Sequence, residues 1–127
     1  MSHFTTVKTQ LAEAEHLRHA LRDLGYRYTE GQAEVRDYSG NRIPVEICVR
    51  TKNKHYSIGF RKVGETYQCV ADWASVRGVN QETFLQQVTQ RYAYHAATAS
   101  LQAQGFSVAA EETLKDGRIH LVLRRMA

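Results

Sequence analysis

Cysteine and proline are scarce in this chain, which has two cysteines and one proline among its 127 residues. Cys48 and Cys69 are too few for the disulfide framework of a small secreted domain, so we expect free thiols. No apolar run approaches the ~20 residues that span a bilayer. The opening segment MSHFTTVKTQ also lacks the basic and apolar regions of a signal peptide. These absences predict a protein that is made and kept in a cytosol-like compartment.

The chain also lacks the short motifs of common catalytic and cofactor sites. It contains no GxSxG, HExxH, P-loop or GxGxxG pattern. A catalytic group assembled in space from distant residues would leave no such pattern, so an enzyme stays an open alternative. The sequence favours a non-enzymatic protein, with no catalytic residue and no cofactor to name.

Composition indicates one compact domain over residues 1–127. Hydrophobic residues make up 43% of the chain and charged residues 24%, and no low-complexity or proline-rich linker divides it. A chain of this length buries roughly two-thirds of its unfolded surface. The net charge of +4 is mild for a dedicated nucleic-acid binder, so the distribution of charge matters more than its total.

Hydrophobic periodicity predicts an α+β fold. Helices are expected over 10–24, capped by Thr9, and over 81–104, capped by Asn80. This order suggests two β-α-β-β half-repeats that form a single-layer antiparallel sheet, with two helices on one face and the other face open. Strands are expected at 3–8, 26–29, 34–38, 45–52, 56–61, 67–73, 106–110 and 119–123.

The first predicted helix has a leucine stripe and a polar side. His16 and His19 are expected to face solvent together with Glu15 and Asp23. Such spacing can gather a divalent metal, but a solvated helix face looks the same, and no further ligand can be named. No metal site is therefore predicted.

The centre of the second predicted helix, VTQRYAYH, crowds polar aromatic side chains together. His95 falls on the apolar face of this helix, among Phe84 and Val88. Two interpretations of His95 stay open. The imidazole is either a core histidine with a hydrogen-bond partner, or a switch or ligand-contacting group that acts with Arg91 and Tyr92.

Basic residues form one run between Glu46 and Glu65 that contains no acidic residue. Strand alternation places them on the sheet face that the helices leave open. This surface is a solvated polar face, a site for an acidic protein, or a site for a nucleic-acid backbone. Tyr56 and Phe60 point the other way, whereas single-strand binders stack bases on aromatics, so an acidic protein is favoured. The candidate contact residues are Arg50, Lys52, Lys54 and Arg61.

Three segments together resemble the hypothetical chloroplast reading frame thirty-five family of cyanobacteria and some algal plastids. They are the opening MSHFTTVKTQ, the central VTQRYAYH, and the DGR turn with its final strand. The resemblance covers essentially the whole chain. Because the family is a domain of unknown function, the resemblance implies no activity, cofactor or site residue. It does imply a cyanobacterial cytoplasm or a plastid stroma.

The leading hypothesis is a small non-enzymatic accessory protein that binds another protein. It would use the basic sheet face or the side of the long helix that carries Tyr94 and Leu101, because both are surplus to folding. A nucleic-acid-binding module is the alternative. A small-molecule site around Arg91, Tyr92 and His95 is a weaker third hypothesis. A homodimer that buries exposed strands is also compatible with the fold.

Overall fold

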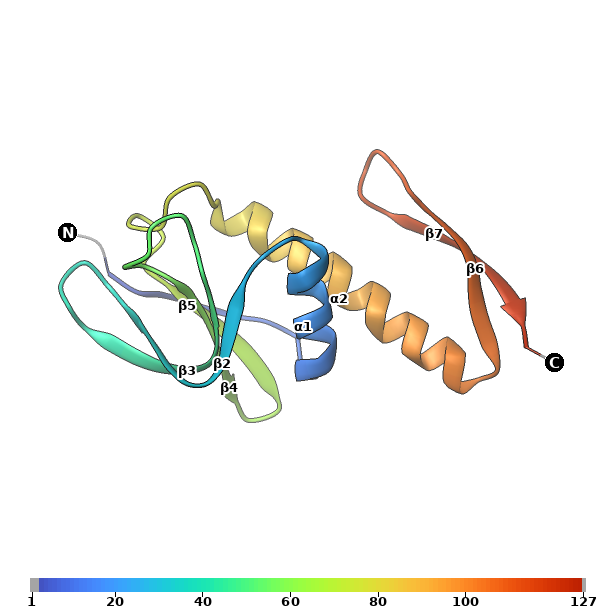
Figure 1. Cartoon of the computed structure of the whole chain (residues 1–127), viewed down its shortest axis with the longest axis horizontal. Coiled ribbons are helices and arrows are strands. Elements are labelled where there is room, and N and C mark those ends of the chain that lie inside the picture. The colour runs from blue at the N-terminus through green and yellow to red at the C-terminus, as the bar shows by residue number, and fades with distance from the viewer. Residues whose placement is uncertain (1–2, 127) are drawn as a thin grey trace.

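The computed structural model describes residues 3–126 and confirms the α+β fold (Figure 1). Within this range the chain forms two helices and seven strands. In chain order these are β1 (Thr5–Lys8), α1 (Ala14–Asp23), β2 (Tyr28–Arg36), β3 (Arg42–Val49), β4 (Ile58–Val63), β5 (Thr66–Ala71), α2 (Gln81–Ala103), β6 (Phe106–Thr113) and β7 (Ile119–Arg125).

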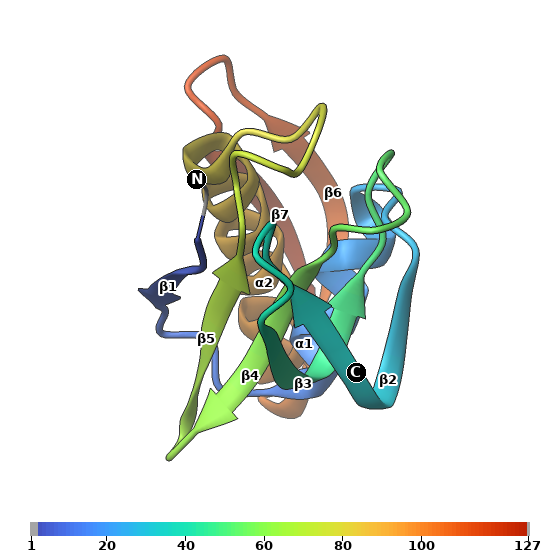
Figure 2. The same ribbon diagram turned by 90° about the vertical axis from the view of Figure 1, so that its left-hand side faces the viewer.

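Five strands form an antiparallel sheet in the order β1-β5-β4-β3-β2, and both helices lie behind it in Figure 2. Ile47 of β3 and Phe60 of β4 are opposite each other in the register and point toward the helices. There they join Leu21 of α1 and Phe84 of α2 in one cluster, and each of the four is at most 1% exposed. Full burial of one such side chain contributes roughly 1.5–3 kcal/mol, so this cluster dominates stability.

The other face of the sheet is partly filled by the chain itself. β3 pairs with β4 only over 47–49, and the remainder of the β2–β3 hairpin curls across the sheet. Val35 and Val45 from this hairpin pack over Gly59, where an added Cβ would lie 2.5 Å from Val45 Cγ1. With Cys48 and Val70 they form a second buried cluster. The expectation of an open sheet face is therefore wrong, because a side chain is missing at 59 and the hairpin folds into that space.

Two buried aspartates hold the tip of this hairpin. Asp37 and Asp72 are each 1% exposed. The backbone N–H of Asn41 donates to Asp37 Oδ1 at 2.8 Å, and that of Tyr38 donates to Asp72 Oδ2 at 2.8 Å. A buried carboxylate that accepts hydrogen bonds from backbone N–H groups has its charge stabilised, and the N–H groups of the turn gain acceptors.

Several predicted element boundaries differ from those in the structure. β3 ends at Val49 and β4 begins at Ile58, so 50–57 is a loop and not two strand ends. The Thr51 hydroxyl donates within this loop to the carbonyl of Tyr56 at 2.6 Å, which competes with strand pairing. α1 begins at Ala14 and Thr9 does not cap it, since the Thr9 hydroxyl donates to the Tyr67 carbonyl and accepts from the N–H of Leu11 outside the helix. The predicted cap Asn80 is confirmed for α2, since its side chain accepts from the N–H of residue 83.

α2 has 23 residues and extends well past the sheet, with the β6–β7 hairpin against its far half (Figure 1). Its fully buried residues, Phe84 and Val88, are both in its first half. In the described chain β6 and β7 pair with each other and not with the five-stranded sheet. The expectation of a single sheet built from two half-repeats is therefore wrong. We call residues 93–126 the C-terminal arm.

Candidate functional site

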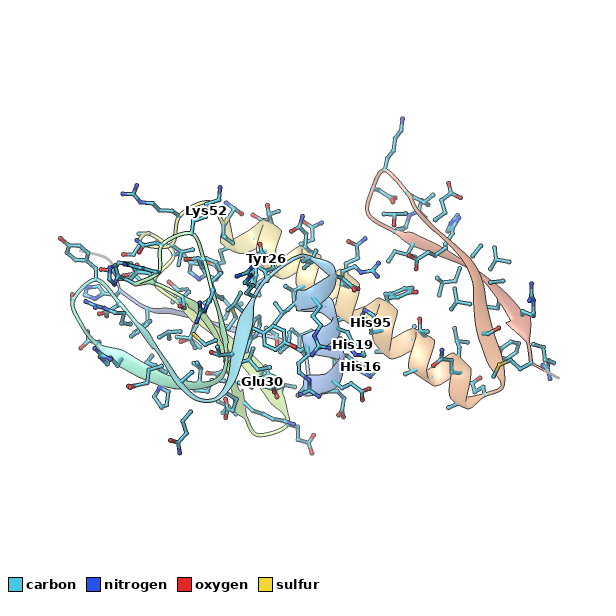
Figure 3. The ribbon with its side chains drawn as sticks, in the orientation of Figure 1. His16, His19, Tyr26, Glu30, Lys52 and His95 are labelled. Carbon is cyan, nitrogen blue, oxygen red and sulfur yellow. The ribbon has the colours of Figure 1, made fainter. Side chains whose placement is uncertain are left out.

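The polar centre of α2 faces the end of α1 and forms a helix junction (Figure 3). His95 Nε2 lies 2.6 Å from Asp23 Oδ2, and Arg91 Nε donates to the same oxygen at 2.9 Å. Burial raises the pKa of Asp23, but the hydrogen bonds and positive charges of His95 and Arg91 outweigh it and lower this pKa below its ordinary 3.8. One carboxylate therefore holds two side chains of α2.

Tyr92 holds the opposite end of α1. Its hydroxyl accepts from the backbone N–H of Ala12 at 3.1 Å and from that of Glu13 at 2.8 Å. Glu13 occupies the N-cap position but makes no side-chain cap. Because the first N–H groups of a helix have no intrahelical partner, Tyr92 satisfies donors at the entry to α1 from another helix. The three predicted residues Arg91, Tyr92 and His95 thus contact both ends of α1.

His16 and His19 face α2, so the expectation that they face solvent with Asp23 is wrong. The His16 ring meets Tyr92 edge-on with centroids 5.5 Å apart, and the His19 ring lies 4.9 Å from that of His95. α1 packs against both the sheet and α2, whereas the leucine stripe predicted packing on one side only. Within residues 3–126, no three His, Cys, Asp or Glu side chains are grouped to hold a metal.

The apolar surroundings predicted for His95 are also wrong. Its side chain is 20% exposed, and its neighbours are Asp23, His19 and the ring of Tyr94 at 5.1 Å. The physical reason is position along the helix. At His95, α2 has left the sheet and lies against the polar end of α1, so the apolar stripe that starts at Phe84 no longer faces a core.

Tyr94 and Leu101, predicted to face a partner, are half-buried in the arm. A hydrogen bond with Glu111 of β6, together with burial, raises the pKa of Tyr94 above its ordinary 10.0. The Arg91 guanidinium carbon stands 4.3 Å from the centroid of the Tyr94 ring. The chain's own hairpin therefore occupies part of this helix side, and Arg91 connects the arm to the junction with Asp23.

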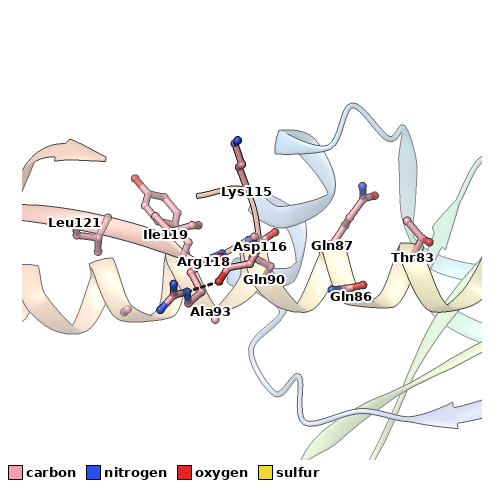
Figure 4. A pocket seen from close by; sticks show the side chains of 13 residues that line it. Thr83, Gln86, Gln87, Gln90, Ala93, Lys115, Asp116, Arg118, Ile119 and Leu121 are labelled. Atoms are coloured by element: carbon pink, nitrogen blue, oxygen red, sulfur yellow. Dashed lines mark hydrogen bonds and ion pairs between the residues drawn. The ribbon is translucent and has the colours of Figure 1, made fainter. Parts of the chain in front are cut away.

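A groove of about 680 Å³ runs between α2 and the β7 side of the hairpin (Figure 4). Amide and small side chains of α2 form one wall, and apolar residues of β7 with the hairpin turn form the other. No residue of β6 lines it. Gln90 and Ala97 of α2 and Ile119 and Leu121 of β7 are among the residues that line it.

The hairpin also exposes large apolar side chains that were not among the predicted contact residues. Val122 is 59% exposed, Leu123 39% and Met126 54%. Their signal in the sequence is the run Leu121 to Leu123, where three successive apolar residues break strand alternation. In a hairpin with one covered face, such a run must leave an apolar residue in solvent.

The four predicted basic residues have different neighbours. Arg50 and Lys54 line a second hollow of about 430 Å³, together with Cys48. Lys52 instead lies against the backbone of the 76–80 loop, since an added Cβ at 78 would stand 3.3 Å from its Cδ. Arg61 of β4 donates to the side chain of Gln68, its cross-strand neighbour on β5, at 2.9 Å. Loop 50–57 separates the four, because its residues do not follow strand alternation.

Comparison with known proteins places the chain in a family. A family described as "Protein of unknown function (DUF1257)" matches residues 20–122. The chain is 37% identical to "Uncharacterized protein ycf35" of Cyanophora paradoxa, 35% to that of Guillardia theta and 32% to that of Pyropia yezoensis. Each comparison covers 98% of both chains. No solved structure matches. Neither α1 nor α2 has the length and apolar character of a membrane-crossing helix. The chain belongs to the ycf35 family of uncharacterized proteins, as its opening and its RYAYH segment indicated.

Proposed function

We propose that this protein is a non-enzymatic accessory protein that binds another protein through its C-terminal arm, in a cyanobacterial cytoplasm or plastid stroma. The observation that carries the proposal is the apolar surface of β7 and the residue after it: Ile119 and Leu121 line the groove, and Val122 and Met126 are more than half exposed. Apolar side chains gathered at a surface often mark protein contact sites. Val122 and Met126 contribute little to the stability of the fold, because they are exposed and remove little apolar surface from water.

An extended segment of the partner suits this site best. In the described chain β7 pairs with β6 alone, so its outer edge carries unpaired backbone N–H and C=O groups. The groove lies on the β7 side of the hairpin. A peptide that adds a third strand beside β7 would satisfy this edge, and its side chains would reach Gln90 and Ala97 on α2. A nucleic acid or small ligand offers no matching row of main-chain groups.

Two alanines of α2 provide a matched test. Ala97 lines the groove and Ala99 does not, although both are exposed. Ala97→Arg should fill the groove with a long charged side chain, whereas Ala99→Arg makes the same chemical change outside it. The tagged variants are used for affinity purification from the native cell, with and without nuclease, followed by mass spectrometry.

We expect one protein to be recovered at stoichiometric level with the wild type and with Ala99→Arg, regardless of nuclease, and to be lost with Ala97→Arg. Thermal unfolding of the two variants should agree within a few degrees. Equal recovery by both variants would remove the groove from consideration. If nothing is recovered at stoichiometric level with the wild type, the accessory role itself fails.

The basic residues are a weaker surface for a protein partner, because Arg50, Lys52 and Arg61 have different neighbours. They do favour a second candidate, a nucleic-acid-binding module, since Arg50 and Lys54 form no ion pair within residues 3–126. That candidate predicts oligonucleotide affinity that falls steeply with salt, in proportion to the phosphates contacted. Absent or salt-insensitive binding would count against it.

A small-molecule site around Arg91, Tyr92 and His95 has less support. Neither the groove nor the second hollow is lined by these residues. Their polar atoms are engaged by α1. We therefore propose that these residues hold α2 against α1 and do not bind a ligand.

A further inference from the structure

We propose that the second hollow is a binding site for a small ligand that carries a phosphate group. This inference is independent of the arm and of its protein partner. The hollow has a volume of about 430 Å³ and lies where β2 and β3 meet the 50–57 loop. Its lining is Thr29, Cys48, Arg50, Thr51, Lys54 and Ser57.

The charge of the hollow is positive and uncompensated. Arg50 and Lys54 both line it, and no carboxylate of the described part of the chain does. Within residues 3–126 neither cation forms an ion pair. The carboxylates nearest in sequence are engaged elsewhere, Glu30 with Arg18 of α1 and Glu46 with the N–H of residue 62. A guanidinium and an ammonium that line one hollow match the oxygens of a phosphate.

The remaining lining residues add neutral donors. The hydroxyls of Thr29 and Ser57 make no hydrogen bond to any other residue that the structure describes. The Thr51 hydroxyl is already used, since it donates to the Tyr56 carbonyl at 2.6 Å. Two cations and two free hydroxyls form a set rich in donors, and phosphate oxygens are acceptors.

The size of the hollow favours a small ligand over a polymer. Its volume falls within the roughly 300–1,000 Å³ of small-molecule sites. A nucleic-acid strand requires a basic track past several phosphates. The two other basic residues do not extend such a track, because Lys52 lies against residue 78 and Arg61 bonds to Gln68. A phosphate monoester or free phosphate fits, and the test separates the two.

Amide chemical shifts measured by NMR during titration provide the test. The probes are inorganic phosphate, AMP and adenosine, added at moderate salt to the wild type, Arg50→Gln, Lys54→Gln and the control Arg124→Gln. Arg124 is an exposed cation on β7, remote from the hollow in the fold. Phosphate and AMP should shift the amides of Thr29 and Ser57 saturably, and adenosine should not.

Each hollow variant should weaken phosphate binding at least about tenfold, as expected for loss of a charge-assisted hydrogen bond, while Arg124→Gln should not change it. Tighter binding of AMP than of phosphate identifies an ester as the ligand, whereas equal affinity identifies free phosphate. The proposal is overturned if neither probe gives a saturable shift, or if Arg50→Gln and Lys54→Gln bind as well as the control. Binding of an oligonucleotide without binding of phosphate or AMP would overturn it in favour of a nucleic-acid site.

Cysteine chemistry gives a second readout that does not depend on assigned amides. Cys48 is 9% exposed and lines the hollow, whereas Cys69 is 0% exposed and burial raises the pKa of its thiol to about 12. A small thiol reagent should therefore modify Cys48 first. Saturating phosphate should slow that modification in the wild type but not in Arg50→Gln. Equal slowing in both proteins would contradict the assignment.

Discussion

The sheet core and the C-terminal arm use apolar side chains in opposite ways. The core buries them on both faces of a curled sheet, with Phe84 against one face and Val45 against the other. The arm has one helix to cover its hairpin and leaves Val122, Leu123 and Met126 exposed. Stability therefore resides mainly in the core, and the arm keeps surface that another molecule can cover.

At the boundary between these two regions, the helix junction adds polar contacts to the apolar packing of α1 against α2. Asp23 holds Arg91 and His95, and Tyr92 holds the entry to α1. Polar contacts of this kind are individually worth about 1 kcal/mol, far less than the core cluster. The helix α2 thus continues from the core into the arm, and these hydrogen bonds fix its middle against α1.

The comparison predicts its largest effect for Phe84, whose ring lies 5.2 Å from that of Tyr26 and 6.0 Å from that of Trp73. Phe84→Ala should lower the free energy of unfolding by roughly 3–5 kcal/mol, because it removes a buried ring and leaves a cavity. Leu123→Ala in the arm should change it by less than about 0.5 kcal/mol. Urea unfolding measures both, and similar losses for the two variants would contradict the division between core and arm.

Gly59 should give the next largest effect. Gly59→Ala would place a Cβ 2.5 Å from Val45 Cγ1 and 2.9 Å from Val35 Cγ1, so the curled hairpin must move. We expect a loss of about 1–3 kcal/mol in the free energy of unfolding. Adding Val45→Ala should recover part of this loss, and a double variant less stable than the sum of the two single changes would argue against the close approach.

The attachment of α1 can be weakened without disturbing the core. Tyr92→Phe removes the hydroxyl that accepts from Ala12 and Glu13, so we expect a loss of about 1 kcal/mol in the free energy of unfolding. Hydrogen exchange at these two amides should accelerate. Tyr94→Phe is the control, because its hydroxyl belongs to the arm. Unchanged exchange in Tyr92→Phe would show that the hydroxyl is not a cap.

Acid should loosen the same junction by a smaller amount. The pKa of Asp23 is lower in the folded chain than its ordinary 3.8, so the folded state binds this proton less tightly than the unfolded chain does. The stability that the Asp23 carboxylate contributes is fully present above about pH 3.8, the ordinary pKa of the unfolded chain. It is lost as the pH falls through the lower pKa of the folded chain. We expect a contribution of about 1 kcal/mol or less for this partly exposed group. Asp23→Asn should flatten that part of the stability–pH curve, whereas Asp116→Asn in the hairpin turn should leave it in place.

Local sequence patterns predicted individual turns and helix caps better than they predicted how the strands pair. The DG turn at 116–117 and the cap at Asn80 were recognisable, because turn and cap chemistry depends on neighbouring residues. The position of the β6–β7 hairpin was not recognisable, because strand pairing joins distant residues. A hairpin inside the main sheet and a separate hairpin have the same alternation of apolar and polar residues. The curl of the sheet depends on one glycine under two valines, which no periodicity reveals.

The candidate site was predicted in part for a similar reason. The spacing of Arg91, Tyr92 and His95 along one helix indicated that they act together. Their partners are 68 to 80 residues away in the sequence, so Asp23 and the entry to α1 were not identified. Arg50 and Lys54 were recognised as basic, whereas the hollow that they share forms only when the loop after β3 is in place.

The hydroxyl of Tyr92 has a consequence for the order in which the chain acquires structure during synthesis. The N–H of Ala12 donates to a hydroxyl that is 80 residues further along the chain and is therefore synthesised later. Until α2 has left the ribosome, the N–H groups at the start of α1 can donate only to water. The leucines of α1 have already left the ribosome by then. The N-terminal helix is therefore completed late, by a contact of high sequence separation, and a truncated chain that ends before Tyr92 would keep that end frayed.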